Sequence, residues 1–185
     1  MLVTLRNSSD KLNTLLDRLG RYGPSAKERP QEINAVECVK RVVGRYEAHH
    51  PVLLVSHEPC MLLANAEPLE QALVHLVQNA IDASDENSPV MLAVIADAFS
   101  CTIEVVDSGS GMSAEFIRSR LFKPFHSSKP GGFGIGAFEA RELVRAMNGR
   151  LDVESREGVG TRFILRLPLA AVADLIDDSS QKDVA

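Results

Sequence analysis

The 185-residue sequence has no tryptophan, and its aromatic residues are two tyrosines and seven phenylalanines. It also has no excess of positive charge: 20 basic and 25 acidic residues give a net charge of −5. This balance argues against binding nucleic acid by neutralising its phosphates. No apolar run reaches the roughly 18 to 20 residues that cross a bilayer, and no signal-peptide pattern opens the chain. We expect a cytoplasmic domain, and whether the full-length protein has an inner-membrane anchor stays open.

Cysteine is scarce as well, and the three cysteines do not form a C-x-x-C pair. They are Cys38, Cys60 and Cys101. This spacing supports neither a zinc site nor a disulfide framework, so each is expected to be a small buried apolar residue in a reducing compartment. Apolar residues make up 45% of the chain and charged residues 24%, which is ordinary for one globular domain with a short appendage.

The N-terminal segment carries leucines at heptad spacing. They are Leu5, Leu12 and Leu19. The spacing predicts a helix that pairs with another helix in a hairpin or dimer, and a helix docked on its own domain is the alternative. Glycine and proline then interrupt the pattern. The expected organisation is a partial hairpin helix at 1–22, a linker at 23–30, a domain at 31–168 and a frayed tail at 169–185.

Helical periodicity is strongest over residues 67–83, where Pro68 suits a first helical turn. Residues 61–64 are expected to pair with a strand at 52–55. The remaining expected elements are a strand and helix over 31–48, strands at 90–96 and 101–106, helices at 114–120 and 138–147, and a closing hairpin of 151–154 with 161–167.

A strand is expected to end at Asp107, followed by Ser-Gly-Ser-Gly. A carboxylate there can accept a hydrogen bond from an exocyclic amine such as that of adenine, and the two glycines allow the backbone close to a ligand. The alternative is a plain turn in which the aspartate binds its own backbone.

His75, Asn79 and Asp82 share the polar stripe of the helix expected at 67–83. The amide oxygen of Asn79 can ligate Mg²⁺, which takes oxygen donors and relies on nucleotide phosphates and waters for the rest. The alternatives are a solvated asparagine and a packed or capping histidine.

The segment from Lys129 to Gly136 holds four glycines and leads directly into a helix. Its amides can surround phosphate oxygens, the helix N-terminus adds positive potential, and the lysine adds a charge. It is not a Walker loop, because no Lys-Ser or Lys-Thr follows the last glycine. Phe122 and Phe125 precede this segment, either filling the core or anchoring a lid. The glycines at 158 and 160 have a sufficient explanation as hairpin turn residues.

These segments, in this order and together with Gly158-x-Gly160-Thr161, resemble the N, G1, F, G2 and G3 boxes of histidine-kinase ATPase domains. The resemblance covers residues 31–168, and the sequences at 75–83 and 121–125 are most similar to those of the PEP-CTERM-system sensor kinases. It implies an α+β fold: a two-layer sandwich in which a mixed sheet backs about three helices. ATP would lie between the helices and a lid at about 123–136.

The resemblance also implies ATP and Mg²⁺ as cofactors. Asn79 would hold Mg²⁺ through the phosphates, Asp107 would bind the adenine amine, and Thr161 would support the adenine end. The phosphates would be held by Lys129, Gly132, Gly134 and Gly136. The other implied ATP-binding residues are Asp82, Gly109, Gly111, Met112, Phe122, Phe125, Phe133 and Ile135. The implied catalytic residues are Asn79, His75 and Lys129.

The related gyrase, chaperone and mismatch-repair ATPases carry a water-activating glutamate four residues before the asparagine. This sequence departs from them, because it has His75 at that position. Phosphoryl transfer to a protein is therefore expected rather than hydrolysis.

No histidine of the sequence stands in an H-[DE]-x-x-[NT] setting. We expect the catalytic domain of a two-component sensor kinase that does not phosphorylate itself. Its expected partners are an upstream phosphoacceptor helix, a response-regulator receiver domain and a second copy through 1–22. The alternatives are an ATPase with a conformational cycle and a non-catalytic nucleotide-sensing module.

Overall fold

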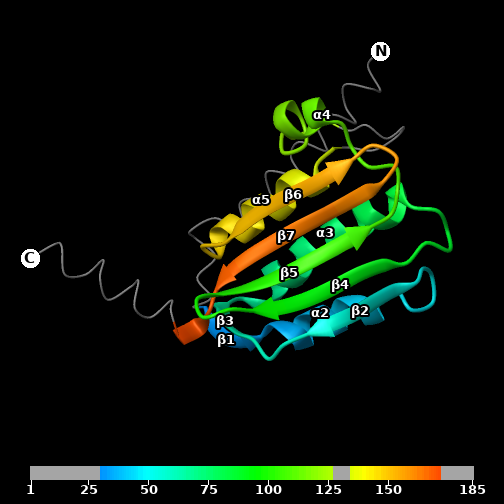
Figure 1. Ribbon diagram of the computed structural model, residues 1–185. Helices are drawn as coiled ribbons and strands as arrows, with labels where there is room; N and C mark the ends of the chain where they lie inside the picture. Colours follow the sequence, from blue (N-terminus) through cyan, green and yellow to red (C-terminus); the bar gives the residue numbers. More distant parts are fainter. Residues whose placement is uncertain (1–29, 127–133, 172–185) are drawn as a thin grey trace, which may run out of the picture.

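The computed structural model describes residues 30–126 and 134–171, in which a five-stranded sheet has three helices packed behind one face (Figure 1). The strand order is β2-β4-β5-β7-β6, with β2 parallel to β4 and every other neighbouring pair antiparallel. The five strands are β2 (Val52–His57), β4 (Val90–Ala96), β5 (Ser100–Asp107), β6 (Arg150–Arg156) and β7 (Gly160–Pro168). The mixed sheet confirms the predicted fold class.

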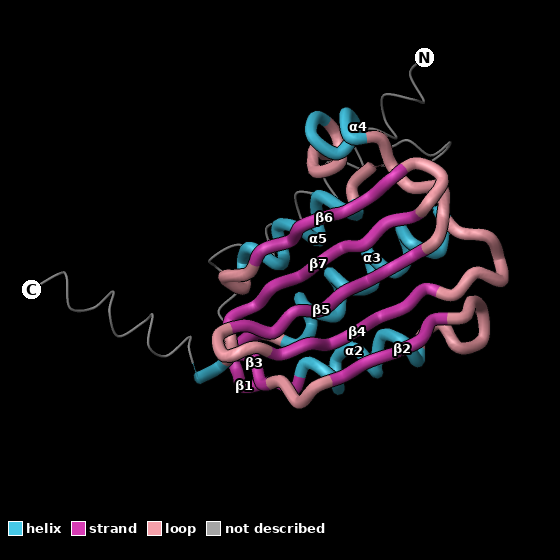
Figure 2. The backbone as a smooth tube through the Cα atoms, in the orientation of Figure 1, coloured by secondary structure: helices cyan, strands magenta, loops and turns pink. Residues whose placement is uncertain are grey.

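The helices behind the sheet form the second layer, as the backbone trace shows (Figure 2). They are α2 (Ala35–Gly44), α3 (Ala66–Ala83) and α5 (Gly136–Ala146). The short helix α4 (Ala114–Ser119) stands apart from this layer, near β6. None of the helices in the described ranges is long and apolar enough to span a membrane.

Strand β3 (Met61–Ala64) pairs antiparallel with β1 (Gln31–Asn34), so the expected pairing of 61–64 with 52–55 is wrong. The chain leaving β2 continues to bind β4: the Glu58 amide donates to the Val94 carbonyl at 3.0 Å, and the Ala96 amide donates to the Glu58 carboxylate at 2.7 Å. The chain leaving β2 thus extends along β4 for one more residue before it turns toward β3.

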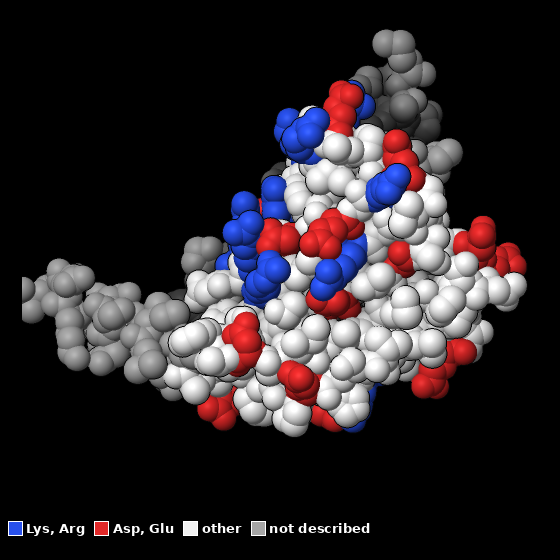
Figure 3. All heavy atoms as spheres, viewed as in Figure 1, with Lys and Arg blue, Asp and Glu red and all other residues white. Residues whose placement is uncertain are grey.

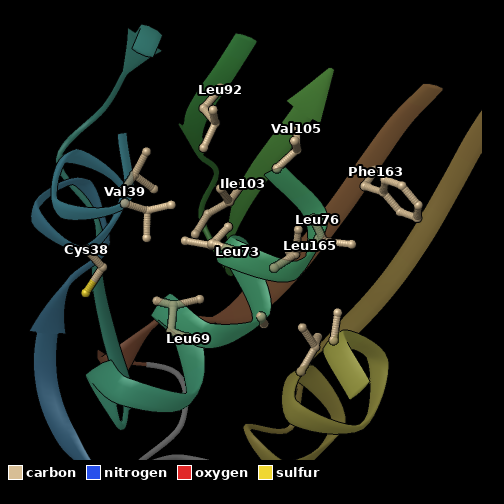
Figure 4. Close-up of a cluster of buried hydrophobic side chains, with 14 of the residues drawn as sticks. Cys38, Val39, Leu69, Leu73, Leu76, Leu92, Ile103, Val105, Phe163 and Leu165 are labelled. Atoms are coloured by element: carbon tan, nitrogen blue, oxygen red, sulfur yellow. The ribbon is translucent and has the colours of Figure 1, made fainter. Parts of the chain in front are cut away.

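The core lies between α3 and the sheet, as Figure 4 shows. The apolar stripe of α3 presents Leu69, Leu73 and Leu76, all fully buried, toward the inner face of β4, β5 and β7. Burying one such side chain stabilises a fold by about 1.5–3 kcal/mol. The stripe therefore fixes how α3 is rotated, and with it the direction of the polar side chains on its other faces.

The three cysteines are buried, as predicted, and carry free thiols. Burial raises the pKa of each thiol, most strongly that of Cys101. Thiolates, the reactive form, are therefore suppressed.

The outer face of the sheet carries ion pairs over β5, β6 and β7. Arg162 contacts Glu104 and also Glu154, and Arg166 contacts Asp152. Figure 3 shows these charges gathered over β6 and β7, with a mostly uncharged surface over β2 and β4. Exposed pairs of this kind contribute only about 0–1 kcal/mol each.

Several predicted features lie outside the described residues. They are the helix at 1–22, nearly all of the linker at 23–30, Lys129, Gly131, Gly132, Phe133 and most of the tail at 169–185.

Candidate functional site

The inner face of the sheet becomes polar in its last row. Asp107, at the end of β5, stands beside Thr161 of β7, which stands beside Ser155 of β6. Asp107 and Thr161 are each only 6% exposed. The neighbouring row along the same face is apolar, with Val105 paired to Phe163. A buried carboxylate thus closes the core at one end of the sheet, where it needs hydrogen-bond partners.

Asp107 binds its own backbone in a turn, which was the alternative interpretation of this motif. Its Oδ1 accepts a hydrogen bond of 2.9 Å from the Gly109 amide. A carboxylate offers about four acceptor positions. The turn therefore orients the carboxyl group and is compatible with a further contact to a ligand.

The two glycines of this loop are required by close packing. A Cβ on Gly109 would stand 2.2 Å from the carbonyl oxygen of Ala83, the last residue of α3. Gly111 has a φ of +63°, and its Cβ would stand 2.0 Å from the Arg156 carbonyl oxygen. The Ser110 amide also donates to the Ala83 carbonyl at 3.0 Å. The loop is therefore held between the end of α3 and the end of β6.

Ser155 ties the loop to the sheet, and the sequence analysis missed it. Its Oγ accepts a 2.9 Å hydrogen bond from the Met112 amide and donates to the Gly160 carbonyl at 2.9 Å. The Thr161 hydroxyl lies 2.9 Å from the same oxygen. One sequence feature could have indicated this role. Side chains of β6 alternate between the two faces of the sheet, so Ser155 points inward as Val153 does, at a position where an apolar residue is expected.

The polar stripe of α3 faces the first turn of α5. A Cβ on Gly136 would stand 3.6 Å from both amide atoms of Asn79 and 3.7 Å from Nδ1 of His75. This glycine begins α5, two residues earlier than predicted, because the Glu139 amide donates to the Ile135 carbonyl at 2.8 Å. The structure thus brings Asn79, His75 and Gly136 together.

Asp82 is the third member of the predicted stripe, and it is exposed. Its Oδ1 accepts a 2.7 Å hydrogen bond from the Gln78 side chain, which is exposed as well. Its predicted role in binding ATP remains a proposal.

A second residue missed by the sequence analysis is Glu139, in the first turn of α5. It is 2% exposed, and its Oε2 lies 3.1 Å from Nε2 of His75. The signal was an ionisable residue on the core-facing stripe of α5, four residues before the buried Leu143. The alternative of a packed histidine is therefore correct as far as it goes, but the packing partner is a buried carboxylate.

The Phe122 segment is attached to α5 by Arg141. The guanidinium carbon lies 4.7 Å from the Phe122 ring centre, and Nη2 donates to the Phe122 carbonyl at 2.9 Å. Phe125 is 49% exposed and has a φ of +66°. Phe122, partly buried against the core, therefore fits the core-filling alternative, and the role of Phe125 in anchoring a lid stays a prediction. A Cβ on Gly134 would stand 2.3 Å from the His126 carbonyl oxygen, so Gly134 lies against the backbone of His126.

Comparison with known proteins places this geometry in a family. Residues 64–171 match the family described as histidine kinase-, DNA gyrase B-, and HSP90-like ATPase. The chain is 30% identical to the C4-dicarboxylate transport sensor protein DctB of Rhizobium meliloti over 172 residues, covering 88% of this chain and 27% of the relative. It is 29% identical to the sensory histidine kinase/phosphatase NtrB of Proteus hauseri, covering 87% of this chain and 50% of the relative. The chain thus spans half or less of the length of these relatives.

Solved structures give the same result. The catalytic domain of histidine kinase ThkA superposes with a TM-score of 0.68 at 25% identity, covering 77% of this chain and 97% of that one. Full-length ShkA, solved in complex with AMPPNP, superposes with a TM-score of 0.72 at 24% identity, covering 91% of this chain and 38% of that one, and shows the fold alone. The narrower resemblance to PEP-CTERM-system kinases stays a prediction. The chain belongs to the histidine kinase-, DNA gyrase B- and HSP90-like ATPase family, as an ATP-binding domain of the sensor histidine kinase type.

Proposed function

We propose that this domain binds Mg-ATP along α3 and presents the γ-phosphate to a histidine on a phosphoacceptor helix upstream of it. The observation that carries the proposal is that α3 connects two different chemical environments. The end of α3 at Ala83 contacts the Asp107 loop, and the side chain of Asn79, one turn earlier, lies on the side where Gly136 begins α5. The adenine base would contact the Asp107 loop and the phosphates the N-terminus of α5, with the ribose between them.

At the base end, Asp107 accepts a hydrogen bond from the adenine amine. Its carboxylate is already oriented by the Gly109 amide and buried beside Thr161. Gly109 and Gly111 line the base, and Met112 is fixed by Ser155. An oriented acceptor in a buried row favours adenine, which offers a donor at this position, over guanine, which offers a carbonyl.

At the phosphate end, the N-terminus of α5 supplies free amides and a partial positive charge. Lys129 and the glycines from 132 to 136 add further contacts to the phosphates. Among the described residues, no group of three or more His, Cys, Asp or Glu side chains is arranged to hold a metal ion. The amide oxygen of Asn79 would hold Mg²⁺ together with phosphate oxygens and water.

The γ-phosphoryl group moves by positioning and charge neutralisation, without a covalent intermediate on this domain. The phosphoacceptor helix, a receiver domain and a second copy through 1–22 are the proposed partners, in the cytoplasm. The complex of ShkA with AMPPNP supports nucleotide binding by this fold. The relatives named as sensor histidine kinases support phosphotransfer.

Calorimetric titration of the 185-residue chain with ATP, with and without Mg²⁺, tests the proposal. We expect ATP binding that strengthens with Mg²⁺, and we expect Asn79→Ala to remove the Mg²⁺ dependence. Asn87→Ala, an exposed asparagine of a turn, is the matched control and should bind as the wild type does. A folded wild type without ATP binding, or equal Mg²⁺ dependence in all three proteins, would contradict the assignment.

A further inference from the structure

Arg141, in the second turn of α5, makes two contacts with Phe122 that the proposed phosphotransfer does not use. Its Nη2 donates a hydrogen bond of 2.9 Å to the Phe122 carbonyl, and its guanidinium carbon lies 4.7 Å from the centre of the Phe122 ring. A guanidinium within about 6 Å of an aromatic ring is attracted to the ring face. The Arg141 side chain is only 24% exposed. One planar group therefore holds both the backbone and the side chain of Phe122.

The residue that Arg141 holds lies near the end of a continuous stretch of chain that begins at the Asp107 loop. After this loop comes α4, and the Leu121 amide then donates to the Phe116 carbonyl at 3.0 Å. Leu121 is only 7% exposed. At the end of the stretch, the His126 backbone lies against Gly134, two residues before α5 begins. The stretch thus contacts the base end of the proposed site through its first residues and the phosphate end through its last residues.

Two described contacts attach the end of this stretch beside α5, one between Arg141 and Phe122 and the other between Gly134 and His126. A segment that is held at both ends has fewer conformations than a segment held at one end. A ligand that binds beside it then loses less conformational entropy in ordering it. Without the guanidinium, the nucleotide would have to order the 122–126 backbone when it binds.

We propose that Arg141 is a positioning residue for the ATP phosphates. By holding Phe122 on α5, it keeps the 122–126 backbone beside the N-terminus of this helix before the nucleotide arrives. Arg141 acts through Phe122, and the adenine base binds at the other end of the site. Affinity for the phosphates should therefore depend on Arg141, whereas affinity for adenosine should not. This inference rests on the proposed ATP site and deepens it.

The experiment compares binding of Mg-ATP, measured by calorimetry, with binding of adenosine, measured by NMR titration, in the 185-residue chain. Arg141→Met keeps an apolar stem and removes the guanidinium. We expect its ATP affinity to fall on the order of tenfold, as for the loss of a hydrogen bond from a charged donor, with adenosine affinity unchanged. Arg141→Lys keeps a cation without the planar fork, so its ATP affinity should lie between those of the wild type and Arg141→Met.

Arg145→Met is the matched control, because this arginine lies one turn later on the same helix. Its side chain is 59% exposed, and its Nη1 donates a hydrogen bond of 3.1 Å to Glu142. We expect this variant to bind both ligands as the wild type does. Thermal unfolding of all the variants shows whether any loss of affinity accompanies a loss of stability.

A double-mutant cycle tests whether Arg141 acts through Phe122. In a Phe122→Leu background the ring contact is already lost, so Arg141→Met should reduce ATP affinity about twofold less than it does in the wild type. Effects of the two substitutions that simply multiply would show that Arg141 acts independently of the Phe122 ring, and would overturn the proposed route.

The remaining outcomes separate this inference from the ATP site itself. Unchanged ATP affinity in Arg141→Met would overturn the positioning role and leave the ATP site standing. Equal losses of ATP and adenosine affinity, together with a lower melting temperature, would assign Arg141 to the stability of the fold instead. A folded wild type that does not bind ATP would overturn the ATP site, and the positioning role with it.

Discussion

Replacing Asp107 with asparagine should weaken ATP binding while leaving the fold intact. Asparagine has the same shape, and its Oδ1 can keep the 2.9 Å hydrogen bond from the Gly109 amide. The lost element is the charged acceptor for the adenine amine. Hydrogen bonds to charged groups are worth about 1.5–3 kcal/mol, and each 1.4 kcal/mol corresponds to a tenfold change. ATP affinity should therefore fall about 10- to 100-fold.

The assay is calorimetry with ATP and GTP, beside thermal unfolding. Because an asparagine amide can donate to the guanine carbonyl, the preference for ATP over GTP should narrow in the variant. Asp97→Asn is the matched control: Asp97 is exposed, and its Oδ1 accepts from the Phe99 and Ser100 amides in the turn between β4 and β5. An Asp107→Asn protein that melts like the wild type and binds ATP equally well would refute the role given to this carboxylate.

Two further predictions concern stability and reactivity. Ser155→Ala removes the hydrogen-bond partner of the Met112 amide and of the Gly160 carbonyl. The free energy of unfolding, measured by urea denaturation, should therefore fall by about 1–3 kcal/mol. An unchanged free energy of unfolding would show that water replaces the hydroxyl. Because burial raises the pKa of all three thiols, the native chain should resist iodoacetamide at pH 8 and react fully once unfolded; rapid labelling of the native chain would contradict their burial.

The sequence was sufficient for the elements whose pattern is local. The periodicity of α3 fixed its apolar face and therefore the stripe of His75 and Asn79. The alternation of β5 placed Asp107 at the end of the inner face, and glycine spacing indicated a loop in close contact. These features follow from side-chain direction along one element.

Other features depended on contacts between distant segments, and there the sequence was insufficient or misleading. The sequence of a short strand such as β3 does not specify which strand it pairs with. Residues 52–55 were predicted as its partner because they are close in sequence, whereas β3 pairs with β1. The partner of His75 lies 64 residues away on α5, and only the packed structure brings Glu139 to it. The role of Ser155 likewise depends on the register of β6 against β7.

The two ends of the site differ in how freely they can change during evolution. At the base end, the loop after Asp107 is fixed by backbone groups of α3, β6 and β7, so most substitutions there would damage the fold along with the binding. At the phosphate end, α3 and α5 contact each other through buried apolar side chains and through the pair of His75 and Glu139, of which Glu139 is only 2% exposed. Replacing one member of a buried pair leaves the other without its partner, so these two positions are expected to change together, whereas the base end is held mainly by backbone groups.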